Sequence, residues 1–387
     1  MRVHARPGPG RLSVGAPPRT KGAAVRVCAC LDSADAHTVK DVSTQTSTSS
    51  AQPAPRWLRL LGGDLSLPAL LCAAALAEFV FYRLLQPLSR LVPQALPPWL
   101  WGFVDLLGSY SLNLASVLSL LVTGAMLLGA MAPGGLAQDP VRRAGLSLMA
   151  LVFIGACSLL ILCPSVAAQY VGLVRAQWLA QTSSVCLSLL ILLSVLPRRT
   201  ARGRHKLALL ALLVPPLLLL ETHWGLLSSR GILQRYTLFL AIYGSTAAAT
   251  ALGVSAALLW PPRPMTWPKD GLPLAVAALL ICSMSVLLLV DRGAAARLIY
   301  IGFDMHLPAA ALAQTLYILS LASWSLTTAA LLARRERSRR RGIGLLLVGL
   351  AGGQARTIHQ ACFFLAGLLC LAESMLEDGP RHLAREP

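Results

Sequence analysis

The sequence predicts an all-α fold, a polytopic transmembrane helical bundle of about nine or ten spans preceded by a disordered N-terminal tail. Composition is the first observation behind this prediction, because 56% of the 387 residues are hydrophobic and only 13% are charged. Soluble domains carry about 25% charged residues. The second observation is a series of apolar runs, and the third is the distribution of charge between them. Together they predict an integral membrane protein.

The first 56 residues are rich in Arg, Pro, Ser, Thr and Ala. They contain no apolar stretch long enough to fold or to form the core of a signal peptide. We therefore expect residues 1–56 to be a disordered tail. Residues 1–31 hold six Lys or Arg and no acid, so an organellar transit peptide is the second interpretation. A start codon assigned too far upstream is the third.

From Trp57 onward, apolar runs recur that are near the length needed to cross about 30 Å of hydrocarbon. Helices are expected, because every backbone N–H and C=O must be paired inside lipid. The transmembrane domain is predicted over 57–376, and a short polar tail over 377–387. The predicted spans are 67–85, 106–131, 144–163, 176–196, 206–222, 237–260, 271–290 and 308–333, followed by the stretch 342–376.

Loop charges give the predicted topology. The breaks after the second, fourth, sixth and eighth runs hold 15 Lys or Arg, against 7 in the opposite breaks. Basic loops stay on the cytoplasmic side of a membrane. We expect the N-terminus on the cytoplasmic-type side of a bacterial inner membrane or an organellar membrane.

The net charge of +18 is concentrated in the tail and in the loops. Nucleic-acid binding needs a continuous basic surface, so we expect no nucleic-acid partner. The expected partners are the lipid bilayer and anionic head groups at the basic loops. Protein partners are not predicted.

The last stretch leaves three arrangements open. Its first apolar half, Gly342 to Gly353, would rise only about 18 Å as a helix, and Gly342 to Leu376 as one helix would be about 52 Å long. One bent helix, a re-entrant half-helix followed by a span, and a tight pair of spans remain. We expect nine crossings, with residues 377–387 outside.

Three predicted spans carry polar residues at helical spacing. Such a stripe faces neighbouring helices or a wet cavity, since lipid offers no hydrogen-bond partner. Ordinary interhelical packing is the alternative to a polar interior. The stripes are Asp105, Ser109, Asn113, Ser116, Ser119 and Thr123; Gln177, Gln181, Ser184 and Ser188; and Gln314, Tyr317, Ser320, Trp324 and Thr327.

Ionisable residues deep in apolar runs are rarer. Glu78 lies within 67–85, and Arg356 and His359 interrupt the final stretch. Burial of each charge costs roughly 2.5–3.5 kcal/mol, so we expect Glu78 and Arg356 to meet, with His359 titrating beside them. The alternative is a structural ion pair. The residues predicted for a substrate or ion pathway are Glu78, Arg356, His359, Asp105, Asn113, Gln177, Gln181 and Gln314.

Enzyme signatures are weak. The sequence has no H-E-x-x-H motif, no Cys/His cluster with metal-ligand spacing and no nucleotide-binding loop. We predict no catalytic residues, no metal site and no cofactor, and the cysteines of the apolar runs are interpreted as free. His205 is placed in a charged loop.

The favoured function is a secondary transporter or permease for a small solute. The alternative is a non-catalytic membrane sensor, scaffold or assembly factor. An intramembrane enzyme acting on a lipid-linked substrate is the third hypothesis, and it lacks a catalytic constellation.

Overall fold

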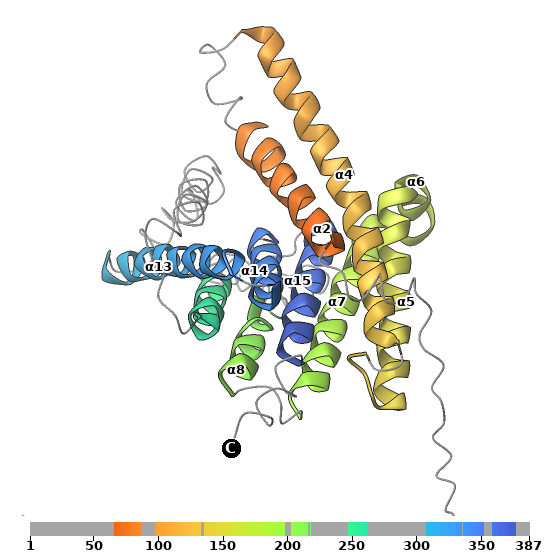
Figure 1. The fold of residues 1–387 in the computed structure, drawn as a ribbon. Helices are drawn as coiled ribbons and strands as arrows, with labels where there is room; N and C mark the ends of the chain where they lie inside the picture. Colours follow the sequence, from red (N-terminus) through yellow and green to blue (C-terminus); the bar gives the residue numbers. More distant parts are fainter. Residues whose placement is uncertain are drawn as a thin grey trace, which may run out of the picture. The chain divides into compact units, whose positions relative to one another are not determined.

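The computed structural model describes residues 66–86, 97–132, 135–197, 203–215, 217, 247–261, 307–334, 336–351 and 358–376. Every regular element within these ranges is a helix (Figure 1). The predicted span 271–290, the two tails and Arg356 lie outside them. The all-α prediction is therefore confirmed for the part of the chain that the structure describes.

Six helices of the described ranges are long and apolar enough to cross a membrane: Leu67–Leu85, Pro98–Met131, Pro140–Leu162, Arg175–Val195, Thr315–Leu332 and Ile358–Leu376. Each overlaps a run predicted from the sequence. Two further predicted runs, 206–222 and 237–260, are represented in part by α8 (Gly203–Ala211) and by the shorter apolar helix Ala247–Leu259. These helices are those of a multi-pass, membrane-embedded protein. A count of nine or ten spans is not confirmed.

Helix α15 (Ile358–Leu376) forms the centre of the packing. All residues from Ala361 to Ala372 are buried, and the helix contacts α14 (Glu336–Leu350), α4 (Pro98–Met131) and α7 (Leu173–Val195), as well as α2, α5 and α8. A helix that is apolar on every side is expected where no face meets water. Helix α15 is thus surrounded by helices that precede it in the sequence.

Helices α14 and α15 form an antiparallel hairpin (Figure 1). The Arg340 guanidinium lies 3.7 Å from the Glu373 carboxylate, and Arg341 Nη2 donates to the Ser374 carbonyl over 3.1 Å. A Cβ atom built on Gly344 would lie 2.8 Å from the Gly367 carbonyl oxygen. These contacts exclude one long helix through the stretch.

The hairpin also corrects the expectation that the chain leaves on the outer side. Because the two helices are antiparallel, the end of α15 lies beside the basic start of α14. The last described residue, Leu376, is therefore at the end of the bundle that carries the arginine run. A single-crossing arrangement fails because the two apolar halves, α14 and α15, run antiparallel beside each other.

Basic side chains cap the C-terminal end of helix α7 (Leu173–Val195). Arg142 Nη1 donates to the Leu193 carbonyl over 2.9 Å, and Lys206 Nζ donates to the Leu196 carbonyl. Both acceptors are C-terminal carbonyls of α7, where a cation is favoured. These residues therefore stabilise helix ends, and binding of anionic lipid by them stays a prediction.

The first described span changes its winding within the membrane segment. Helix α2 (Ser66–Ala77) continues without a break into the π-helix η1 (Glu78–Leu85). A π-helix has hydrogen bonds from residue i+5 to residue i, and it is rare and associated with functional sites. The change of winding starts at Glu78, the single acid of this span.

Candidate functional site: a buried ion cluster

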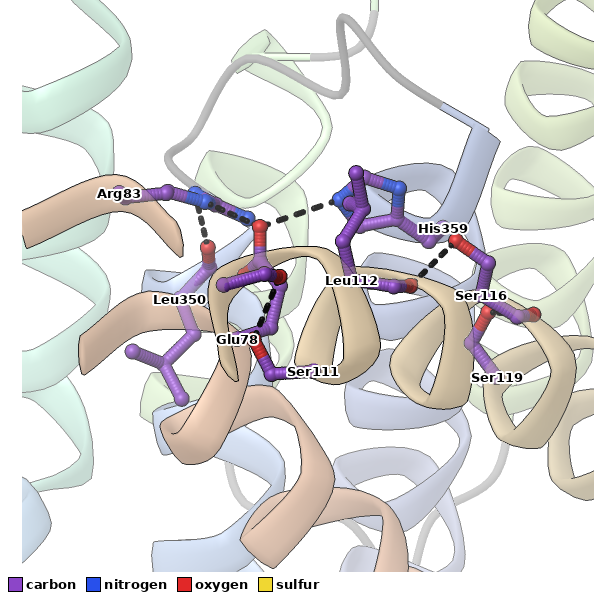
Figure 2. Close-up of polar contacts among 9 residues, drawn as sticks. Glu78, Arg83, Ser111, Leu112, Ser116, Ser119, Leu350 and His359 are labelled. Carbon is purple, nitrogen blue, oxygen red and sulfur yellow. Dashed lines mark hydrogen bonds and ion pairs between the residues drawn. The ribbon is translucent and has the colours of Figure 1, made fainter. Parts of the chain in front are cut away.

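Glu78 is the centre of a buried ionic cluster. Glu78 is 1% exposed. One carboxylate oxygen, Oε1, accepts a hydrogen bond from Arg83 Nε over 2.8 Å and lies 3.3 Å from His359 Nε2 (Figure 2). The Arg83 and His359 side chains are 15% and 8% exposed. One acid and two nitrogen bases thus meet away from water.

The π-helical winding brings Glu78 and Arg83 together. The two residues are five positions apart, and in an α-helix residues at this spacing point about 140° away from each other. In a π-helix, residue i+5 follows residue i by one turn, so the side chains lie on one face. The ion pair therefore depends on the local winding of η1.

Arg83 also binds the end of helix α14. Its Nη1 donates to the Leu350 carbonyl oxygen over 2.8 Å (Figure 2). The last carbonyls of a helix have no partner within the helix and carry the negative end of its dipole. A guanidinium is therefore well placed there, and it ties the first described span to the hairpin.

His359 lies in the first turn of α15, where the helix dipole is positive. Its ring packs edge-to-face on Phe363, with ring centroids 5.7 Å apart and an interplanar angle of 70°. The Glu78 carboxylate thus meets the N-terminal end of one hairpin helix, and Arg83 meets the C-terminal end of the other. The signs of the charges match the dipoles at both ends.

The ion pair uses only part of its hydrogen-bonding capacity. Among the described residues, no hydrogen bond is made by buried Oε2 of Glu78 or by buried Nη2 of Arg83. Arginine and carboxylate often pair through two parallel hydrogen bonds. An unpaired buried polar atom costs about 1–3 kcal/mol and calls for an explanation. Arg83 and Glu78 are therefore joined by one hydrogen bond rather than by two, which we call a one-armed geometry.

The predicted pathway residues separate into two groups. Glu78 and His359 come together, as expected, and Arg356 lies outside the described residues. Asp105 and Asn113 are exposed, Gln177 is half-buried and Gln181 is buried. Gln314 lies in α13 (Leu307–Leu332). The structure therefore brings together two of the eight residues.

Arg83 is the functional candidate that sequence reasoning missed. Arg83 stands near the end of the predicted run 67–85, and it was counted there among the seven Lys or Arg of the breaks opposite the basic loops. The sequence signal was the spacing Glu78-x-x-x-x-Arg83, which pairs only in a π-helix. His205, which was placed in a loop, is instead buried in α8 with 2% exposure.

The polar stripe of α4 does not form one buried surface. Asp105, Ser109 and Asn113 are exposed, whereas Ser119 and Thr123 are buried. Ser119 Oγ donates to a carbonyl of its own helix, and Thr123 Oγ1 donates to the Cys362 carbonyl over 3.1 Å. In this stripe, hydroxyls thus satisfy backbone carbonyls, as in ordinary helix packing.

Within the described ranges, no group of three His, Cys, Asp or Glu side chains is placed to hold a metal ion. The fold and the cluster define a multi-pass membrane protein with a buried acid–arginine–histidine site. No family model, curated protein or solved structure matches the chain. The functional argument therefore depends on the cluster itself.

Proposed function

We propose that the protein is a secondary transporter or permease for a small solute, in which the Glu78–Arg83–His359 cluster couples solute movement to an ion. The observation that carries the proposal is the position of this cluster between the facing ends of α14 and α15. Ionisable groups inside membrane spans are expensive and occur mainly on ion or substrate pathways.

The helix ends support the same proposal. In many secondary transporters, discontinuous helices end near the middle of the bilayer, and their polar ends contact substrate or ion. Helix α14 ends at Leu350 and α15 begins at Ile358. Both ends contact a charged residue of η1. A cation and an anion held in this way can exchange partners without large motions of the surrounding helices.

Reconstituted vesicles test the proposal. The purified protein is placed in liposomes, and counterflow of labelled small solutes is measured under imposed proton and sodium gradients. We expect at least one solute to move under a gradient, and Glu78→Gln to remove the coupling. Glu373→Gln is the matched control, because Glu373 pairs with Arg340 at the basic end of the hairpin.

Gradient-driven flux that survives in Glu78→Gln would exclude the cluster as the coupling site. Flux indistinguishable from empty liposomes across the whole panel would overturn the transporter assignment. Measurement in both membrane orientations keeps an inverted preparation from giving a false negative.

A non-catalytic scaffold is the second candidate, and close hairpin packing favours it. The backbones of Gly344 and Gly367 approach so closely that a Cβ atom on either residue would lie under 3 Å from the opposite carbonyl oxygen. A rigid, fully buried α15 is expected of a structural element. In that case Glu78→Gln lowers stability and changes no flux.

A further inference from the structure

The one-armed geometry of the ion pair indicates what the site binds. The inference rests on the proposed transport function and deepens it. A side-on arginine–carboxylate pair uses Nε and Nη2 toward the two carboxylate oxygens. In this cluster Nε bonds Oε1, while Nη2 and Oε2 have no partner among the described residues. The two atoms that would form the second hydrogen bond of a side-on pair are therefore the two that are unpaired.

We propose that Arg83 Nη2 and Glu78 Oε2 together receive the carboxylic acid group of a small solute, which is transported as one carboxylate with one proton. Nη2 is a donor and binds a carboxylate oxygen of the solute. Oε2 is an acceptor and takes the accompanying proton, which is then shared between the two carboxyl groups. One anion and one proton enter together, so the charge of the cluster does not change.

The surrounding charges favour a carboxylate over other small polar groups. Arg83 is a fixed cation, and the N-terminal end of α15 carries the positive end of a helix dipole. His359 Nε2 lies 3.3 Å from Glu78 Oε1, in the first turn of this helix. A primary amide has the same donor and acceptor pair as a carboxylic acid, but it gains nothing from these positive groups.

The helices of the cluster and those packed on it carry other titratable groups. Cys72 of α2 and Cys362 of α15 are buried, whereas Tyr82 of η1 and Asp105 and Tyr110 of α4 are exposed. Helix α14 contributes the Leu350 carbonyl through Arg83. The proton that accompanies the solute is therefore assigned to Glu78, whose Oε2 is unpaired.

Access to the site requires a second conformation. Both unpaired atoms are buried, so a solute does not reach them in this conformation. The Arg83–Leu350 hydrogen bond holds the hairpin end against η1, and its release is the step that would open the site. Acid–solute binding and hairpin opening are thus linked through one guanidinium.

Binding to the full-length protein in detergent tests the inference without any need for transport. The probes are acetate, L-lactate and pyruvate, each compared with its neutral amide by titration calorimetry. We expect saturable binding of at least one acid, at least tenfold weaker binding of its amide, and uptake of one proton per anion measured with a pH indicator dye.

Variants locate the site. Arg83→Gln and Arg83→Lys are both expected to weaken acid binding at least tenfold. Glutamine removes the charge, and lysine keeps the charge but lacks the planar guanidinium that binds a carboxylate through two hydrogen bonds. Arg142→Gln, at an exposed arginine that also caps a helix, should bind as the native protein does. Glu78→Gln should abolish the proton uptake. The native protein's preference for acid over amide needs no variant and stands if a variant fails to fold.

Equal binding of acid and amide, binding unaffected at Arg83, or no binding of any of the three acids would overturn the inference. Acid binding without flux in vesicles would contradict the transporter assignment and leave the carboxylate site in place. Flux of another solute without acid binding would contradict the carboxylate site and leave the transporter assignment in place.

Discussion

Arg83 and Leu350 lie 267 positions apart, and Arg83 Nη1 donates to the Leu350 carbonyl oxygen over 2.8 Å. This hydrogen bond joins the first described span to the closing hairpin. The same guanidinium bonds Glu78 within its own helix. A single side chain therefore holds both the acid and the helix end in place.

Removal of Arg83 should destabilise the fold strongly. Arg83→Gln leaves the Glu78 carboxylate buried without its cation, and breaking a buried pair from one side costs about 3–5 kcal/mol. The double variant with Glu78→Gln should be more stable than Arg83→Gln alone. Thermal unfolding in detergent measures this coupling, and simple additivity of the two changes would contradict a direct interaction.

Side chains at the hairpin glycines should separate α14 from α15. Gly344→Ala places a Cβ 2.8 Å from the Gly367 carbonyl oxygen, so the backbones must move apart, at about 1–3 kcal/mol. Gly155→Ala is the control, because a Cβ there meets nothing within 4 Å. That change should stabilise the protein slightly, by about 0.5–1 kcal/mol. Equal unfolding temperatures for both variants would refute the close contact.

Trp324 should be coupled energetically to Gly349. The indole is fully buried and donates from Nε1 to the Leu345 carbonyl over 2.8 Å, and a Cβ on Gly349 would overlap the ring. Gly349→Ala should therefore be destabilising, and Trp324→Leu should relieve it in the double variant. Unfolding measurements on the four proteins give the coupling. A double variant as unstable as the sum of the singles would argue against this packing.

Cys157 and Cys362 should cross-link under oxidation. The two thiols are free and buried, and they are neighbours between α5 (Pro140–Leu162) and α15. In a background without other cysteines, copper phenanthroline should join them, and mass spectrometry of the peptides detects the product. The control pair is Cys163 with Cys362, because Cys163 is exposed at the end of α5. Preferential cross-linking of the control would refute the packing of α5 on α15.

Helix positions could be predicted from the sequence wherever the length of an apolar run alone determines them. The run 67–85 and the helix Leu67–Leu85 coincide, and 144–163 and Pro140–Leu162 nearly do. The hydrocarbon thickness sets these lengths. The hairpin was one of three open arrangements, because helix length says nothing about which apolar halves pack together.

The site was predicted in part for the same reason. The high energy of buried charge predicted a meeting of Glu78 and Arg356 with His359 beside them. Glu78 and His359 meet, and Arg356 lies outside the described residues. The geometry of the pairing could not be predicted, because residue spacing was interpreted with the α-helical period. In that period Arg83 points away from Glu78, and only the π-helical turn brings it back.

The π-helical winding of η1 sets the direction in which the Arg83 side chain points. Rewinding these eight residues from π to α would swing Arg83 about its helix axis and break its contacts with Glu78 and Leu350 in one movement. A change of winding in one helical segment therefore acts on the ion pair and on the end of α14 at the same time.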